Sequence, residues 1–236
     1  SEIGQRLWEK EYDDLYIKYY LALLTMELGE FEKAYIEAKD LLNKFSGHYG
    51  ARKIIYRYYF EKGEYKKAKD KLLDLLEEWS YDQSLIEELK KVNDYLIKIY
   101  KEKMLEEPDN KKIKLELGWS LFQNNLYQEC LSILEHLELD DKIYYEYYNL
   151  LTRTYMVMED YEKAYPCAKI WLEEILKAKD KVKDEENICD EDKKIVRRLP
   201  LAYYFIAKCY YSFAQTKKDE SYIDKCMEYF DLAIET

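Results

Sequence analysis

The sequence predicts an all-α protein in which antiparallel helix pairs stack into a right-handed α-solenoid. Three observations support this fold class. The 236 residues include only six Gly and three Pro, which leaves few positions for tight β-turns. Charged residues make up 37% and hydrophobic residues 48%, a balance that is typical of amphipathic helices. A short motif recurs at an interval of 34 residues, the length of one helix pair.

The recurring motif marks the turn between the two helices of a pair. It occurs as LGEFEKA at 28–34 and as KGEYKKA at 62–68. Its aromatic and small residues return at 127–130 and at 161–164, again 34 residues apart. Apolar residues with helical periodicity precede and follow each copy. The motif therefore predicts a series of helix-turn-helix units.

This period divides the chain into five to six helix pairs within one solenoid domain over residues 1–236. The approximate repeats are 15–48, 49–80, 81–108, 111–142, 145–178 and 200–236, with a charged insertion at 177–198. The insertion is expected to contain an extended helix end and a mobile acidic loop, because it has few apolar residues.

The unit at 81–108 is degenerate. The interval from Tyr65 to Tyr127 is 62 residues, six fewer than two periods. We expect two short helices in this unit, near 84–92 and 95–106, separated at 93–94. One uninterrupted helix is the alternative.

The repeated motif resembles the tetratricopeptide repeat family, whose unit carries W-x2-L-G-x2-Y, then A-x3-F, then P. Leu117-Gly118 matches the first part of that pattern, and Ala34, Ala68 and Ala164 fill its small position. The closing Pro is nearly absent. The resemblance covers most of the chain. It implies a superhelix whose concave side, lined by the first helix of each pair, binds an extended peptide or a helix.

The repeat register places a set of basic, polar and aromatic residues on this concave side. They are Tyr19, Lys53, Arg57, Phe60, Trp119, Phe122, Asn149, Arg153, Tyr204, Lys208 and Tyr211. This lining is expected to contain no acid, although the chain has a formal net charge of −11. Such a groove suits an acidic, partly apolar peptide or a chain-terminal carboxylate. Ordinary solvated charges on a helix surface are the alternative interpretation.

The sequence predicts an interaction scaffold that belongs to a larger protein. Enzymatic activity, a cofactor and a metal site are not expected. The two histidines, His48 and His136, have no nucleophile or metal ligands nearby in the repeat, and no phosphate loop or catalytic elbow is present. The narrower alternative is a co-chaperone adaptor, such as the repeat region of a J-domain protein. Its full carboxylate clamp is absent, because Tyr19 and Leu23 stand where Lys and Asn are required.

The expected partner is a protein or peptide. The negative net charge disfavours nucleic acid and anionic membranes, and no stretch of about 20 apolar residues could span a bilayer. Five cysteines without a CxxC pair favour free thiols and a cytoplasmic location. These are Cys130, Cys167, Cys189, Cys209 and Cys226.

The last helix is expected near 222–234 and carries a wide apolar stripe. Its apolar residues are Ile223, Cys226, Met227, Phe230, Ala233 and Ile234. Part of this face is expected to need a cover, which a second copy forming a homodimer, a neighbouring domain or the binding partner could supply.

Overall fold

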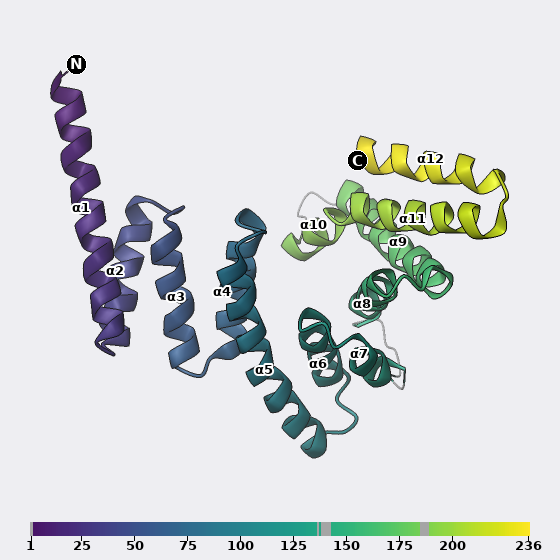
Figure 1. Cartoon of the computed structure of the whole chain (residues 1–236), viewed down its shortest axis with the longest axis horizontal. Coiled ribbons are helices and arrows are strands. Elements are labelled where there is room, and N and C mark those ends of the chain that lie inside the picture. Colours follow the sequence, from purple (N-terminus) through teal and green to yellow (C-terminus); the bar gives the residue numbers. More distant parts are fainter. Residues whose placement is uncertain (1, 136, 138–142, 185–188) are drawn as a thin grey trace. The chain divides into compact units, whose positions relative to one another are not determined.

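The computed structural model describes residues 2–135, 137, 143–184 and 189–236. Helices account for most of this part of the chain, and it contains no strand, so the all-α fold class is confirmed. The helices, labelled in Figure 1, are α1 (Glu2–Glu27), α2 (Phe31–Lys44), α3 (Tyr49–Glu61), α4 (Tyr65–Glu78), α5 (Gln83–Glu106), α6 (Lys111–Gln123), α7 (Tyr127–Leu134), α8 (Tyr144–Val157), α9 (Tyr161–Asp184), α10 (Asp190–Val196), α11 (Leu199–Lys217) and α12 (Ser221–Glu235).

The chain divides into two compact units, Ser1–Ile99 and Tyr100–Thr236. Unit 1 holds α1 to α4 and most of α5, and unit 2 holds α6 to α12. The expected single solenoid over 1–236 stays a prediction.

In unit 1, α1 packs on α2 and α3 packs on α4, and α2 also contacts α3. Figure 1 shows these helices running alternately in opposite directions. Four alanines without solvent exposure, Ala22, Ala34, Ala38 and Ala51, lie in the core where the helices approach one another. Small side chains at these positions let the backbones come close, and larger groups such as Leu41 fill the space between them.

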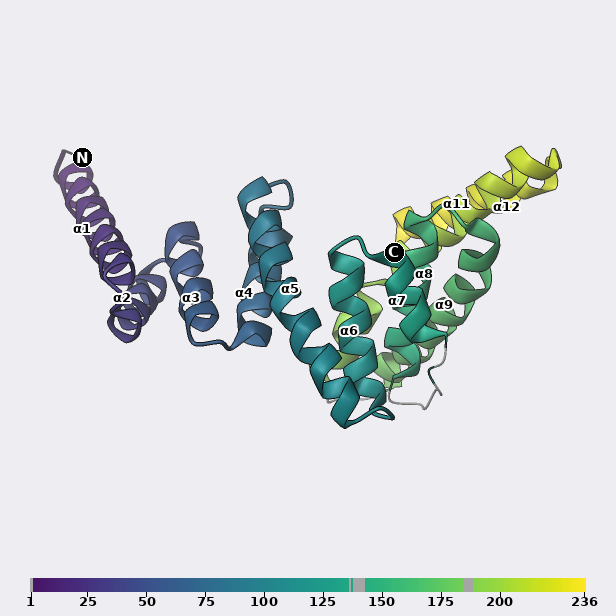
Figure 2. The same ribbon diagram turned by 60° about the horizontal axis from the view of Figure 1, so that its bottom comes forward.

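In unit 2, the pairs are α6–α7, α8–α9 and α11–α12, and α9 contacts α11 (Figure 2). Gly118 explains how α6 fits against its neighbours. A Cβ atom at this position would lie 3.0 Å from Leu150 and 3.5 Å from Leu134. The Leu117-Gly118 dipeptide therefore lies at a close contact between helices.

The unit at 81–108 forms one helix, α5, so the expected pair of short helices is wrong. The helix contains neither Gly nor Pro. Its buried residues Leu85, Leu89, Val92 and Leu96 repeat every three or four positions, which continues one apolar face across the expected break. Asn93, expected to separate two helices, lies fully buried within α5.

The charged insertion contains more helix than expected. Helix α9 extends to Asp184, as predicted, but α10 replaces part of the expected loop, and 185–188 lie outside the described residues. Ile195 explains why α10 forms, because it packs against the core of unit 2 and gives this polar segment an apolar anchor. In the last pair, α11 runs to Lys217, and only three residues separate it from α12.

Candidate functional site

The same turn joins the two helices in four pairs and fixes where each first helix places its side chains. Its central residue has a left-handed backbone, with φ of 80°, 72°, 62° and 58° at Gly29, Gly63, Asn125 and Glu159. The next N–H bonds to a carbonyl five residues earlier, as Glu30 does to Thr25 at 3.0 Å. This arrangement is a Schellman turn, which satisfies carbonyl groups at the end of the first helix. The second helix begins two residues after the left-handed position.

A fully buried small residue follows in each second helix, three positions after its first residue. These residues are Ala34, Ala68, Cys130 and Ala164. They have no solvent exposure, so they are packing positions. The helix pairs therefore have the helix-turn-helix form that the 34-residue motif predicts.

The chain is similar to several solved structures at low sequence identity. No protein-family model and no curated protein matches the sequence. Among solved structures, the tetratricopeptide repeat protein YrrB is 18% identical, covering 72% of this chain and 90% of its own, with a TM-score of 0.34. MamA is 15% identical, covering 91% of this chain and 92% of its own, with a TM-score of 0.37. A tetratricopeptide repeat protein from Parabacteroides merdae is 11% identical, covering 93% and 80%, with a TM-score of 0.37. The assignment of the fold rests on the repeated turns and packing positions of this chain.

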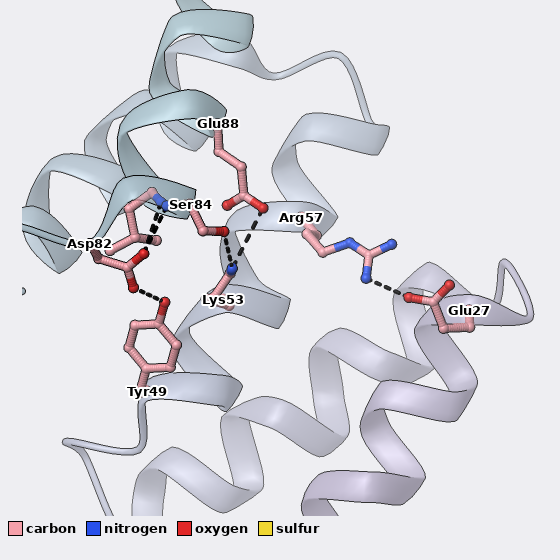
Figure 3. A network of polar contacts seen from close by, with 8 residues as sticks. Glu27, Tyr49, Lys53, Arg57, Asp82, Ser84 and Glu88 are labelled. Carbon is pink, nitrogen blue, oxygen red and sulfur yellow. Dashed lines mark hydrogen bonds and ion pairs between the residues drawn. The ribbon is translucent and has the colours of Figure 1, made fainter.

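In unit 1, carboxylates form ion pairs with the two predicted cations of α3. Arg57 Nη1 lies 2.5 Å from Glu27 Oε1 on α1, and Lys53 Nζ lies 3.5 Å from Glu88 Oε1 on α5. Lys53 also donates to Ser84 Oγ at 3.3 Å. Figure 3 shows both cations of α3 reaching toward these neighbouring first helices. The expectation of a lining without acids is therefore wrong here, because the acids come from adjacent repeats.

A second contact ties α3 to the start of α5. The Tyr49 hydroxyl donates to Asp82 Oδ2 at 2.5 Å, and Asp82 Oδ1 accepts from the Ser84 N–H at 2.9 Å (Figure 3). The hydrogen bond from Tyr49 lowers the pKa of Asp82, so this carboxylate stays charged. Burial, together with the same bond, raises the pKa of Tyr49. These residues form what we call the unit 1 network: Glu27, Tyr49, Lys53, Arg57, Asp82, Ser84 and Glu88.

The two aromatic residues predicted on this surface make internal contacts. A Cβ atom on Gly50 would lie 2.3 Å from the Tyr19 ring, so Tyr19 rests directly on the α3 backbone. Phe60 packs edge-on against Tyr65 and Tyr95, which stack on each other with ring centroids 4.6 Å apart. These contacts assign Tyr19 and Phe60 to packing between repeats.

In unit 2, Asn149 and Arg153 of α8 meet over a buried tryptophan. Arg153 Nε donates to Asn149 Oδ1 at 2.8 Å. Its guanidinium carbon lies 5.9 Å from the ring centroid of Trp171, which has no solvent exposure. The hydrogen bond and the cation–π contact hold the guanidinium in one orientation.

Two charged residues that were not predicted complete this group. Glu146 remains open to solvent, but the protein around it desolvates the carboxylate and raises the pKa of Glu146. Arg153, Asn149, Trp119 and Arg198 are near enough to act in the opposite direction. Desolvation, and then the charge of Arg198, lower the pKa of Arg153. We call Trp119, Glu146, Asn149, Arg153 and Arg198 the guanidinium site.

The guanidinium site differs from the unit 1 network in its charge balance. Among the described residues, Arg153 and Arg198 form no ion pair, whereas Lys53 and Arg57 each have a carboxylate partner. The site holds two guanidinium groups and one carboxylate. Its first-helix spacing could have revealed Glu146, because Glu146, Asn149 and Arg153 lie on one helix face at steps of three and four.

The remaining predicted residues of the concave side belong to α6 and α11 of unit 2. Phe122 packs edge-on against Trp119, with ring centroids 6.0 Å apart. On α11, Lys208 lies over the Tyr204 ring at 5.9 Å, and Tyr204 contacts Phe230 of α12. Tyr211 is exposed on the same helix. In the described part of unit 2, these three α11 residues make no hydrogen bond, ion pair or ring contact with the guanidinium site.

The raised pKa of Glu146 predicts a pH dependence of stability. An acid whose pKa is higher in the folded state binds its proton more tightly there, so its favourable contribution is lost as pH rises from the ordinary value of 4.5 through the raised value. Glu146→Gln should therefore gain stability relative to the parent as pH rises from about 4.5 to 7. Denaturant unfolding at several pH values measures this, with Glu173→Gln on α9 as the control. A constant difference across this range would contradict the assignment.

Other chemistry is limited in the described chain. His48 caps α3 by accepting the Ala51 N–H at 3.1 Å, and burial lowers the pKa of His48. His136 lies outside the described residues. The five cysteines are unpaired, and burial raises the pKa of Cys130 to about 11, so this thiol stays protonated.

The described residues contain neither a metal-binding cluster nor a membrane-spanning helix. No group of three His, Cys, Asp or Glu side chains could hold a metal ion there. None of the described helices is long and apolar enough to span a membrane. The absence of enzymatic activity stays a prediction.

Proposed function

We propose that this protein is an interaction scaffold and that its guanidinium site binds a carboxylate of a partner peptide. The observation that carries this proposal is the orientation of the Arg153 guanidinium and its lack of an ion pair among the described residues. Asn149 and Trp171 orient the guanidinium. Arg198 adds a second guanidinium nearby.

Preorganisation favours this site over the unit 1 network. A guanidinium group can hold a carboxylate through two parallel hydrogen bonds, and little side-chain entropy is lost when the group is already fixed. In unit 1, a partner carboxylate would first have to displace Glu27 from Arg57 or Glu88 from Lys53. Binding at Arg153 requires no such exchange.

The aromatic residues beside the site indicate the rest of the ligand. Trp119 lies next to the charged groups, and Phe122 packs against it. A partly exposed aromatic pair suits an apolar side chain that follows the carboxylate. We therefore expect an acidic, partly apolar peptide. The chain's own charge of −11 should make binding to a highly acidic partner weaker at low ionic strength than at high ionic strength.

Arg153→Ala should weaken binding of such a peptide about tenfold to a hundredfold, because a charged hydrogen bond contributes about 1.5–3 kcal/mol. The probe is a fluorescent peptide that contains one Asp beside a Leu, with its C-terminus amidated, and anisotropy measures its affinity. Arg57→Ala is the matched control, because this arginine is already paired with Glu27. Equal affinities of the parent and Arg153→Ala would overturn the proposal.

Two further peptides identify which carboxylate is bound. The first replaces Asp by Asn and keeps the amidated end, and the second has no acidic side chain and a free C-terminus. Recognition of a side-chain carboxylate predicts loss of binding for the first peptide. Preferential binding of the second would favour the narrower co-chaperone role, in which a chaperone tail is the ligand.

We also propose a cytoplasmic location, which the five unpaired cysteines support.

A further inference from the structure

Helix α1 and Leu28, the residue directly after it, expose an apolar stripe on the side opposite the core contacts of the helix. The exposed residues are Tyr16, Ile17, Tyr20, Leu21, Leu24 and Leu28. Ala22 and Met26, on the other side of the helix, are buried against α2 and α3. A continuous apolar row of this length is unusual on a free surface. We call it the α1 stripe.

Helix α12 exposes a second stripe with the same spacing. Ile223, Met227 and Ile234 are exposed, and Phe230 is half-buried between them. These four residues are separated by steps of four, three and four, as are Ile17, Leu21, Leu24 and Leu28. Each stripe therefore extends over three helical turns, and we call the second one the α12 stripe.

Within the chain, the second helix of one pair packs against the first helix of the next pair through a residue that follows the buried small position. In α2, Tyr35 follows the buried Ala34 and stacks on Tyr58 of the next first helix, with ring centroids 4.3 Å apart. In α9, Tyr165 follows the buried Ala164 and packs against Phe213 of α11 at 5.7 Å.

Met227 holds the corresponding place on the helix face of α12, because it follows the buried small residue Cys226, which lies five positions after the first residue of α12 instead of three. Tyr35 and Tyr165 each pack on a following first helix, but Met227 is 55% exposed.

On the first helices, the residues that receive this contact lie at one fixed distance from the left-handed residue of the turn, and Leu24 lies at the same distance. Tyr58 lies five residues before the left-handed Gly63, and Phe213 lies five residues before the left-handed Lys218. Leu24 lies five residues before the left-handed Gly29. Tyr58 and Phe213 receive an aromatic ring from the preceding second helix, but Leu24 is 57% exposed.

We propose that the α12 stripe of one molecule packs against the α1 stripe of a second copy, so that Met227 meets Leu24. The two stripes are the two halves of a contact that this chain already forms twice within its units, at Tyr35–Tyr58 and Tyr165–Phe213. The occupant is therefore another copy of the same chain, which continues the stack. Such a contact joins two different surfaces, and it can extend beyond a dimer because each added copy still has one free stripe.

Two single substitutions test the contact on the whole chain. Leu24→Glu blocks only the α1 stripe, and Met227→Glu blocks only the α12 stripe. The mass of the parent, measured by light scattering over a range of concentrations, should rise past that of a dimer. Each variant alone should remain a monomer. An equimolar mixture should form a dimer that does not grow, because the intact α12 stripe of Leu24→Glu can bind the intact α1 stripe of Met227→Glu.

Every other pattern overturns this proposal. A parent that is monomeric at all concentrations excludes self-association. Dispersal by Met227→Glu alone indicates contact between two α12 stripes, and dispersal by Leu24→Glu alone indicates contact between two α1 stripes. A mixture that stays monomeric also contradicts the contact. Leu105→Glu, at an exposed leucine of α5 outside both stripes, should behave like the parent, and circular dichroism confirms that the variants fold.

Discussion

Trp171→Ala should lower the free energy of unfolding by about 3–5 kcal/mol, the range for removing a buried aromatic side chain. Trp171 is one of the largest fully buried residues and lies in the core cluster of unit 2. It contacts Tyr145 of α8 and Phe205 of α11, so its loss leaves a cavity between consecutive repeats. Denaturant unfolding followed by circular dichroism measures the change.

Tyr81→Ala is the control for this substitution. Tyr81 is 96% exposed, so its replacement should change stability by no more than about 0.5 kcal/mol. If both variants unfold at the same denaturant concentration as the parent, Trp171 does not support the core as the structure indicates.

Ala68→Leu should destabilise the protein by about 1–3 kcal/mol, because the added carbons overfill a contact between helices. Ala68 has no solvent exposure and follows the first turn of α4. The same measurement applies. Glu77→Leu, on the exposed side of α4, inserts the same side chain where space is open and should have little effect. Equal stability of Ala68→Leu and the parent would show that the proposed repeat register is wrong.

The sequence alone predicts the helix pairs well because the 34-residue period records local structure. The turn at Gly29 and the small residue at Ala34 are set by contacts within one helix pair, so a short motif is enough to identify them. The break expected at Asn93 fails for a related reason. A polar residue suggests a turn, but the apolar face on either side decides that α5 continues.

The candidate site is harder to predict because its charge balance depends on side chains from different helices. Projection of α3 identifies Lys53 and Arg57, but their partners Glu88 and Glu27 come from α5 and α1. Arg198 precedes α11 at the end of the charged insertion, where no repeat register applies. Glu146 is the exception, since its spacing from Asn149 was visible.

The turn at Glu159 bears on how such repeats diverge. Its left-handed backbone costs a residue with a side chain about 1–2 kcal/mol, whereas Gly29 and Gly63 adopt the same conformation freely. Since Glu159 keeps this conformation, the two helices it joins must impose the turn. A glycine can then be replaced during evolution while the helix pair keeps its geometry. Substitutions of this kind change the sequence of the motif before they change the geometry of the helix pair. Repeats with a common origin can therefore keep the same structure while sharing almost no residues.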